Sequence, residues 1–387
     1  MNIHIKNGRV IDPANACDAV KDVYIANGQI QSVGEKPAGF VAQQSIDASN
    51  KWVLPGFVDL NASLREPGYE HKATIQSETK AAVSAGYTSI CCLPDTQPVL
   101  DTPSVVQLIL DKAALAGSAK VLPLGALTVG LQGKALSEMY ALKKAGCVAV
   151  SQAPNNTIDN QILRRALQYA STHDLLVILK PEDISIKDDG CIHDGSVSSK
   201  LGLSGIPVSA ETVAIAQMIE LAEETGARIH LTGVSSARAV TMIARAQATN
   251  DAISADVHAY QLSLTEFDVG TFDANYHTSP PLRSVEDRDA LVAGVAKGML
   301  RLVDEGILDL SQMVSRLTDG PSVTLGLATG RLSEGAPADL CIVDPDKTWL
   351  VDEEHWFSQG INTPYLGHQM KGKVTHTLVN GHLVFEE

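Results

Sequence analysis

Apolar strand-like runs alternate with helix-like stretches along most of the chain, and this alternation constrains the fold more than any other feature. The apolar runs lie at residues 53–60, 88–93, 120–126, 147–152, 175–179, 228–232 and 253–258. Helical patterning lies between most of them, at 75–85, 102–116, 159–173, 210–224 and 236–247. Gly86, Gly146 and Gly226 precede the next strand, as left-handed C-terminal caps do. The pattern predicts a parallel sheet in an α/β fold, and this many repeats predicts a closed (β/α)8 barrel of the TIM type.

The repeat yields seven strands, whereas a closed barrel of this kind has eight. After the seventh strand, the helix-like stretch 285–297 continues through residues 298–300 into another helix-like stretch at 301–305. Either the eighth βα unit is missing near 298–301, or a segment is absent from this sequence. Both alternatives stay open at this point.

The two ends of the chain follow a different pattern, with short alternating runs separated by tight turns. Asn7-Gly8, Asn27-Gly28 and Asn380-Gly381 are the hairpin type of dipeptide. We therefore predict that residues 1–52 and 330–387 together form a small β-sandwich domain. Residues 53–329 would form the barrel domain.

Composition excludes several classes of protein. The chain has 387 residues, a formal net charge of -15 and no long run of basic residues, which argues against a nucleic-acid or anionic-membrane surface. Its six cysteines form no CxxC pair, so we expect reduced thiols that pack as small hydrophobic groups. With no apolar signal region at the N-terminus and no apolar run of membrane-spanning length, we expect a cytoplasmic protein.

In barrels of this type, chemistry takes place at the carboxyl ends of the strands. Asn61 and Ser63 follow the first apolar run and, being two apart on a strand, face the same side. Histidines at these two positions would form a pair of metal ligands. Asn61 and Ser63 offer neutral oxygen atoms instead, and these bind a divalent transition metal poorly.

Several long segments resemble the dihydroorotases of the amidohydrolase superfamily. These are PGFVDLNASLREPG (55–68), AGYTSICCLPDTQP (85–98), SSKLGLSGIPVSAETVAI (198–215), PPLR (280–283), EGAPADLCIVDPD (334–346) and NTPYLGHQMKGKVTHTLVNG (362–381). They occur in the family's order and span nearly the whole chain. The resemblance implies an amidohydrolase barrel that holds two metal ions through histidines, a carboxylate and an aspartate at the strand ends.

The same resemblance implies that every ligand position that can be placed is changed. The His-x-His pair is replaced by Asn61 and Ser63, and the carboxylate after the fourth strand by Ala153 or its neighbours Ser151 and Gln152. The histidines after the fifth and sixth strands are replaced by Lys180 and Gly233. The family's eighth-strand aspartate motif is not found. We therefore predict that zinc is lost, that no other cofactor replaces it, and that no catalytic residues remain.

A few other polar residues match or neighbour substrate-contacting positions of the family. We predict a vestigial substrate pocket of Arg65, Asp95, Asn275 and His277, although Arg65 fits equally well as a structural arginine tied to Glu66 or to a loop. Asp95 stands where the family has an asparagine, and its charge would repel an anionic substrate. Asn275, His277 and Arg283 follow the seventh apolar run; they could be remnants of substrate contacts, but the favoured interpretation is that they are polar groups that solvate a loop.

Two further polar positions have simpler interpretations. His230 is expected to be a hydrogen-bonded core residue of the sixth strand. Glu182 and Asp183 could form a carboxylate pair for acid–base work, but Lys180 nearby makes an ion pair the simpler interpretation.

Three functions follow as hypotheses. The first is a catalytically inactive dihydroorotase-like subunit, a homo-oligomer within a larger hetero-complex, that scaffolds and supports the aspartate transcarbamoylase catalytic chain in pyrimidine biosynthesis. That partner is implied by the resemblance alone. The second is an active cyclic-amide hydrolase, of dihydroorotase or hydantoinase type, with atypical metal ligands. The third is a sensor that binds a pyrimidine precursor through Arg65.

Overall fold

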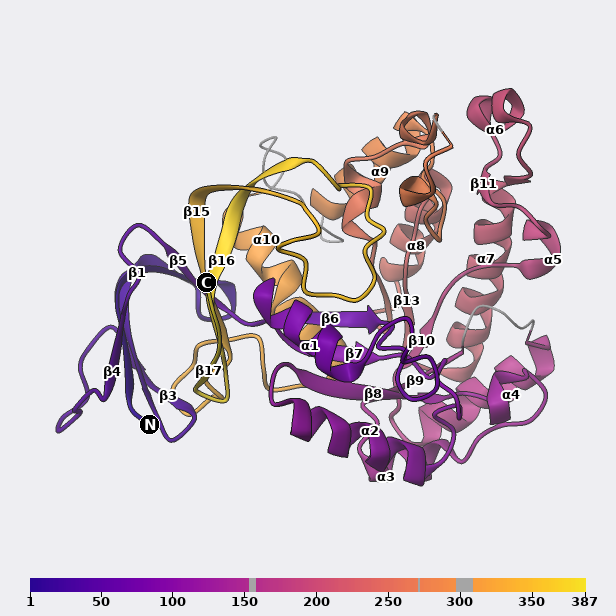
Figure 1. The fold of residues 1–387 in the computed structure, drawn as a ribbon. Coiled ribbons are helices and arrows are strands. Elements are labelled where there is room, and N and C mark those ends of the chain that lie inside the picture. The colour runs from indigo at the N-terminus through magenta and orange to yellow at the C-terminus, as the bar shows by residue number, and fades with distance from the viewer. Residues whose placement is uncertain (153–157, 271, 297–308) are drawn as a thin grey trace.

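A computed structural model describes residues 1–152, 158–270, 272–296 and 309–387 of the chain. Figure 1 shows a β-rich part that contains both termini and, beside it, an α/β part with helices around a parallel sheet. The predicted α/β fold class is confirmed: a curled parallel sheet of the barrel type stands next to a sheet from both ends of the chain.

The terminal sheet has eight strands, five from the N-terminal end of the chain and three from the C-terminal end. Its order is β17-β16-β15-β5-β1-β2-β3, and β4 pairs with β1. The strands are β1 (Ile3–Asp12), β2 (Cys17–Ala26), β3 (Gln29–Val33), β4 (Gln44–Asp47), β5 (Trp52–Pro55), β15 (Leu340–Leu350), β16 (Gln369–Val379) and β17 (His382–Glu386). The predicted hairpins at Asn27-Gly28 and Asn380-Gly381 are confirmed, because all four residues have positive φ, as such turns require.

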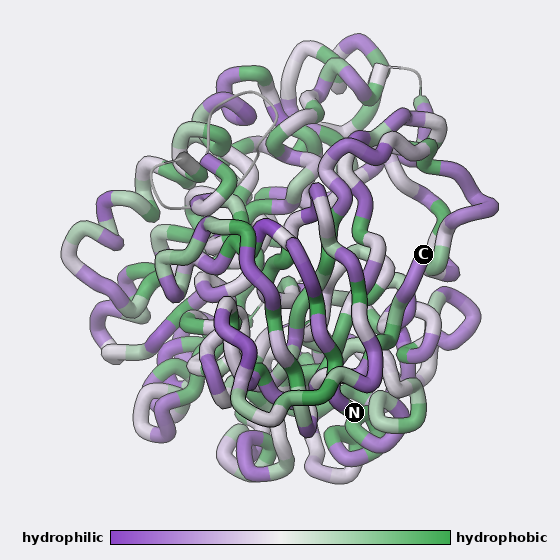
Figure 2. Tube along the Cα trace, turned by 90° about the vertical axis from the view of Figure 1, so that its left-hand side faces the viewer, coloured by the Kyte–Doolittle hydropathy of each residue, from purple (hydrophilic) through white to green (hydrophobic). Residues whose placement is uncertain are grey.

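Apolar and polar residues alternate along these strands, so that one face of the sheet is apolar and buried. The aliphatic residues Ile5, Ile25, Val53 and Leu340 have no exposed surface and belong to one core cluster. In Figure 2, where this part of the molecule faces the viewer, hydrophobic and hydrophilic segments alternate along the strands. Both ends of the chain therefore contribute to one apolar core, which holds the termini together.

The α/β part contains seven parallel strands in the order β14-β13-β10-β9-β8-β7-β6. They are β6 (Phe57–Ala62), β7 (Tyr87–Cys92), β8 (Lys120–Ala126), β9 (Ala149–Gln152), β10 (Val177–Leu179), β13 (Ile229–Leu231) and β14 (Ile253–Ala255). The main helices are α1 (Ile75–Ser84), α2 (Pro103–Ala116), α3 (Met139–Ala145), α4 (Asn160–Thr172), α7 (Val208–Thr225), α8 (Ala237–Gln247) and α9 (Val285–Ala296). Each strand lies within a predicted apolar run or extends it by one or two residues, and the order follows the chain, as in a barrel.

One predicted strand, 53–60, is wrong in a specific way. The chain splits it at Gly56 into β5, which pairs with β1 and β15, and β6, which pairs with β7. A Cβ atom on Gly56 would lie only 2.1 Å from the hydroxyl oxygen of Thr88. Only glycine fits where the chain passes from one sheet to the other.

The expected position of the eighth βα unit, near 298–301, lies outside the described residues. Within the described part, β6 and β14 are the two edges of the parallel sheet and do not pair with each other. The short helices α10 (Leu310–Leu317) and α11 (Asp319–Leu325) follow and contact β6.

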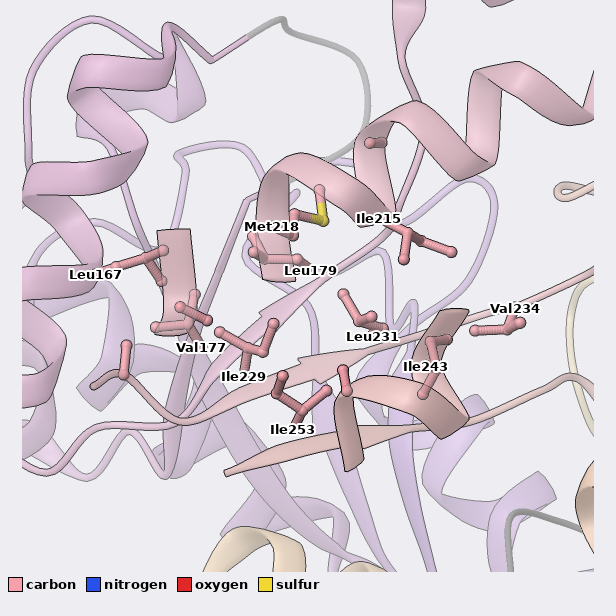
Figure 3. Packing of buried hydrophobic residues seen from close by; sticks show 14 of the residues in the cluster. Leu167, Val177, Leu179, Ile215, Met218, Ile229, Leu231, Val234, Ile243 and Ile253 are labelled. Carbon is pink, nitrogen blue, oxygen red and sulfur yellow. The ribbon is translucent and has the colours of Figure 1, made fainter. Parts of the chain in front are cut away.

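The largest apolar cluster packs α4, α7 and α8 against β10, β13 and β14. Figure 3 shows Leu167, Val177, Ile229, Leu231 and Ile253 packed together, each 2% exposed or less. Fully burying one such side chain stabilises a fold by about 1.5–3 kcal/mol. This cluster therefore fixes the half of the sheet on which much of the candidate site is built.

The cysteines follow the sequence prediction. All six are free thiols, and Cys91, Cys92, Cys147 and Cys341 are buried. Burial raises the pKa of the Cys147 thiol to about 12, which keeps the thiol protonated and unreactive. Among the described helices, none is long and apolar enough to cross a membrane.

Candidate functional site

A cavity of about 340 Å³ opens at the carboxyl ends of the parallel strands, which is where barrel proteins place their chemistry. Its volume lies at the lower end of the range for small-molecule sites. Ten of its twelve lining residues are polar or charged, and the lining consists of Asn61, Ser63, Arg65, Leu93, Pro94, Asp95, Ser151, Gln152, Lys180, Thr232, His258 and Ser279. Five of the predicted site residues, Asn61, Ser63, Arg65, Asp95 and Lys180, are therefore brought together.

Asn61 and Ser63 face the same cavity, as their spacing predicts. The amide of Asn61 donates a hydrogen bond to the Thr232 hydroxyl across the barrel, with a distance of 3.0 Å from Nδ2 to Oγ1. Ser63 forms no hydrogen bond with any other described residue. Of these two residues, only Asn61 is therefore fixed by a side-chain hydrogen bond among the described residues.

Arg65 lies at the mouth of the cavity, where its guanidinium donates to the Asp95 carboxylate at 3.2 Å. Both side chains are partly exposed, at 38% and 28%. Of the alternatives left open by the sequence, a pairing of Arg65 with Glu66 is wrong, because Glu66 instead accepts from the backbone of Ile75 and from Lys112. Asp95 therefore neutralises the arginine that would otherwise attract an anion.

The fourth and fifth strands present an amide and an amine to the site. Gln152 is buried, and both polar atoms of its side-chain amide are hydrogen-bonded: the oxygen accepts from Thr128, and the nitrogen donates to the Leu131 carbonyl. The Lys180 ammonium donates to the Ser279 hydroxyl at 2.7 Å and to Glu182 at 3.3 Å. The predicted ion pair between Lys180 and Glu182 is confirmed. Ala153 lies outside the described residues.

Lys180 carries its charge in a largely buried position. Burial lowers the pKa of its amine, and this effect outweighs the opposing attraction of Glu182. The other oxygen of Glu182 binds Lys187 at 3.0 Å, so one carboxylate is shared between two ammonium groups. Asp183, the second member of the predicted carboxylate pair, instead caps α5 (Ile184–Lys187).

Gly233 follows β13 and has a φ of +73°, a conformation that favours glycine. A Cβ atom at this position would lie 3.0 Å from Nε2 of His258 and 3.4 Å from Pro280. The imidazole of His258 therefore occupies space that a side chain at position 233 would need.

Asp256, just after β14, is the centre of a partly buried hydrogen-bonded network, with its own side chain 20% exposed. Its carboxylate accepts from Thr232 at 2.9 Å, from the Gly233 backbone at 2.6 Å and from His230 at 3.0 Å. Burial would raise the pKa of this carboxyl, but the hydrogen bonds and the nearby imidazoles outweigh burial and hold the pKa below its usual range. The prediction for His230 is confirmed: it lies in β13, 2% exposed, and also contacts Ser254.

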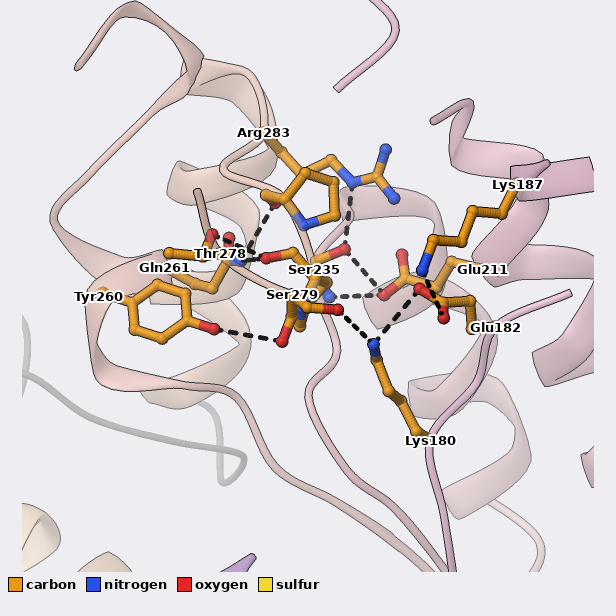
Figure 4. A network of polar contacts seen from close by, with 12 residues as sticks. Lys180, Glu182, Lys187, Glu211, Ser235, Tyr260, Gln261, Thr278, Ser279 and Arg283 are labelled. Carbon is orange, nitrogen blue, oxygen red and sulfur yellow. Dashed lines mark hydrogen bonds and ion pairs between the residues drawn. The ribbon is translucent and has the colours of Figure 1, made fainter. Parts of the chain in front are cut away.

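Behind Lys180 lies a second network, centred on Arg283 (Figure 4). Arg283 donates to the Ser235 hydroxyl at 3.1 Å and to the Ile206 carbonyl at 2.8 Å. Ser235 in turn donates to Glu211 through both its backbone and its hydroxyl. The interpretation of Arg283 as a loop-solvating residue is wrong: it is only 3% exposed, because Ser235, Ile206 and His193 satisfy its donors inside the protein.

Asn275 and His277 do not reach the cavity. They lie on or beside the short 3-10 helix η5 (Ala274–Tyr276), where Asp273 accepts from the backbone of Asn275. His277 is exposed and Asn275 is half-buried. The predicted vestigial pocket is thus reduced, in the described structure, to Arg65 and Asp95.

Three comparisons with known proteins agree with this architecture. A family model described as dihydro-orotase-like matches residues 50–239. A dihydroorotase-like protein of Pseudomonas aeruginosa is 43% identical over 423 aligned positions that cover all of both chains. A dihydroorotase of Trichlorobacter lovleyi is 37% identical, over all of this chain and 99% of its own length. The chain belongs to the dihydroorotase-like family.

Solved structures extend this likeness to the fold. The L-hydantoinase of Arthrobacter aurescens superimposes with a TM-score of 0.85 at 20% identity, covering 99% of this chain and 96% of that one. A dihydropyrimidinase from Brevibacillus agri gives 0.83 at 20% identity, covering 100% and 95%. These neighbours share the barrel and terminal-sheet architecture.

The alignment with the P. aeruginosa relative also contains positions at which this chain has no residue. It runs over 423 positions, 36 more than the 387 residues of this chain. A barrel of eight βα units takes about 250 residues, or roughly 30 per unit. The difference is thus about the size of one such unit.

The residues present do not fit the zinc ions that the family resemblance implies. Protein zinc ligands are thiolates, imidazoles and carboxylates. The described ligand positions offer an amide, a hydroxyl, an ammonium and a glycine, at Asn61, Ser63, Lys180 and Gly233. The ammonium of Lys180 would repel a cation, and the Asn61 amide is already hydrogen-bonded to Thr232.

Sequence reasoning missed Thr232, Asp256, His258 and Ser279 as parts of the site. A signal existed for two of them: Asp256 and His258 follow the seventh apolar run and are two apart, the same spacing that singled out Asn61 and Ser63. Ser279 gave no such signal, because it lies far along the loop that leads away from β14.

Proposed function

We propose that this dihydroorotase-like chain is catalytically inactive and supports aspartate transcarbamoylase as a structural subunit in pyrimidine biosynthesis. One observation carries the first part: the positions that would hold the metal present Asn61, Ser63, Lys180 and Gly233. Opening a cyclic amide in this family needs a metal that polarises the carbonyl and lowers the pKa of a bound water. These side chains can supply neither function.

The cavity itself supports the same proposal. Its arginine is paired with Asp95, its lysine with Glu182 and Ser279, and its asparagine with Thr232. A working site keeps such groups available for substrate, whereas here they bind one another. The described parallel sheet and the terminal sheet both keep well-packed apolar cores, which suits a protein used for its surface.

The transcarbamoylase partner rests on the family resemblance, and an assembly of several copies of this chain with that partner is part of the proposal. Neither a nucleic acid nor a membrane is proposed as a partner. The proposed location is the cytoplasm, where pyrimidine synthesis would place the complex.

Metal content and turnover test the inactivity. The purified chain, expressed in zinc-rich medium, is expected to bind less than about 0.5 zinc per chain, because no preformed ligand set remains. It is also expected to show no dihydroorotate hydrolysis. The T. lovleyi dihydroorotase, prepared in the same way, is the matched control. Stoichiometric zinc with turnover would favour the alternative of an active hydrolase with atypical ligands.

Co-purification tests the partner. The chain and the organism's transcarbamoylase catalytic chain are expected to elute together and to give higher transcarbamoylase activity than the catalytic chain alone. Separate elution with unchanged activity would disprove the scaffold role while leaving the inactivity intact. The two parts of the proposal can thus fail independently.

A further inference from the structure

The parallel sheet is held together at its two edges by side chains. β6 and β14 lie at opposite ends of the strand order and do not pair within the described residues. A cavity of about 210 Å³ lies there, lined by β6, by the segment that follows β14, and by α10 and α11. Asn61 and Asp256 both belong to this lining and are linked through a third residue: Asn61 on β6 donates to Thr232 after β13, and Thr232 donates to Asp256 after β14. Two edges that share no backbone pairing are therefore connected by a chain of two hydrogen bonds.

The direction of each bond in this chain is consistent. The Asn61 amide donates to the Thr232 oxygen, and the single hydroxyl proton of Thr232 is then free to go to Asp256. The carboxylate is an ionised acceptor, and hydrogen bonds to ionised groups are about twice as strong as neutral ones. Thr232 is only 4% exposed, so water does not readily replace either bond.

We propose that Asn61, Thr232 and Asp256 form a clasp that bridges the two edges of the described parallel sheet in place of the metal-binding site. These residues do not fit the zinc implied by the family, but they do fit one another. The side chains at these strand ends form hydrogen bonds across the barrel. The metal-ligand position 61 is part of this clasp, whereas Ser63, which faces the same cavity, is not.

A matched pair of substitutions tests the clasp. Thr232→Val keeps the shape of the side chain but removes the hydroxyl, and Thr232→Ser keeps the hydroxyl. We expect Thr232→Val to lower the melting temperature by about 1–4 °C, since Asn61 loses its acceptor and Asp256 loses one of its donors at a buried position. Thr232→Ser is expected to lower it by less than half as much.

Hydrogen exchange gives a readout that a merely local bond would not change. In Thr232→Val, backbone amides of both β6 (Phe57–Ala62) and β14 (Ile253–Ala255) are expected to exchange about tenfold faster, with a smaller change in the central strands β9 and β10. A response in β14 without β6 would overturn the proposal. So would a uniform rise in all strands, because it would show only a general loss of stability.

Asn61→Ala removes the donor at the other end of the clasp. It replaces Thr232→Val as the test if that variant does not fold. It is expected to speed exchange in β14, although Asn61 has no direct contact with that strand. The melting temperature of the double variant Asn61→Ala/Thr232→Val is expected to lie close to that of the less stable single variant, since both changes break the same chain of bonds. Ser63→Ala, on the same strand end, is the control and is expected to leave exchange unchanged. Fully additive melting shifts would contradict the clasp.

Discussion

The cavity mouth and the network behind Lys180 both hold an arginine beside a carboxylate, but water reaches only one of them. At the mouth, Arg65 and Asp95 are 38% and 28% exposed and share one 3.2 Å contact. In the network, Arg283 is 3% exposed and Glu211 is 4% exposed, and both bind Ser235. The same residue types therefore do different work: burial makes Arg283 part of the fold, whereas Arg65 keeps the character of a surface residue.

Removing the buried arginine tests this contrast most strongly. Arg283→Met is expected to lower the free energy of unfolding by about 3–5 kcal/mol, because Ser235, Ile206 and Glu211 lose a buried cationic partner. Urea unfolding gives the measurement. The control is Arg164→Met, whose pair with Glu224 is 41% and 50% exposed and is worth less than about 1 kcal/mol. Equal losses for the two variants would remove the distinction.

Lys180 lines the cavity and neighbours the Arg283 network, and its removal is expected to lower the free energy of unfolding by an intermediate amount. Lys180→Met removes hydrogen bonds to Ser279 and Glu182, but Glu182 keeps its contact with Lys187. The expected loss is about 1–3 kcal/mol by urea unfolding. A loss as large as that of Arg283→Met would show that the buried network extends to the cavity wall.

The pH dependence of stability sharpens the comparison. Burial raises the pKa of Glu211 in the folded protein above its ordinary 4.5. The folded state therefore binds more protons than the unfolded state, and this group's contribution to stability falls as pH rises from about 4.5 through the raised pKa.

Glu211→Gln cannot ionise and still offers Ser235 an acceptor. Relative to the unmodified chain, the variant is expected to gain stability as pH rises through this window, by at most about 1.4 kcal/mol per pH unit. Chemical unfolding at several pH values measures the difference. Glu220→Gln, on the exposed face of α7, controls for the loss of a surface charge; a matching slope in that variant would refute the assignment to burial.

The smallest effect is expected at the mouth. Arg65→Ala should lower the free energy of unfolding by less than about 1 kcal/mol, because its ion pair is partly exposed. Thermal melts at low and high salt measure it, and the small loss is expected to shrink further in high salt. A loss above about 2 kcal/mol would place Arg65 with Arg283 as part of the fold.

Much of the fold was predictable because apolar runs alternate with helix signals along most of the chain. The strand at 120–126 and the helix at 102–116 have nearly the predicted bounds. The split at Gly56 was missed, although Pro55-Gly56 is a turn signal within the run 53–60. The requirement for glycine there comes from Thr88, which the sequence does not place beside it. Local patterns reveal elements, whereas changes of sheet depend on contacts between distant residues.

The site divides in the same way. Asn61 and Ser63 followed from strand spacing, and Lys180 and Gly233 from the family resemblance. The pairing of Arg65 with Asp95 joins residues 30 positions apart, and that of Asn61 with Thr232 joins residues 171 apart. Arg283 was predicted wrongly because a loop position in the sequence does not reveal the Ser235 and Ile206 acceptors that bury it.

The sheet built from both ends has a consequence for how the chain is made. Leu54 pairs with Cys341, so 287 positions separate β5 from its neighbour β15. At translation rates of about 5–20 residues per second, the N-terminal strands wait on the order of 15–60 s for that partner. During this time the edge of β5 is unpaired and open to other chains. The barrel strands emerge before β15, so β5, one of the first strands to be made, gains this neighbour only near the end of synthesis.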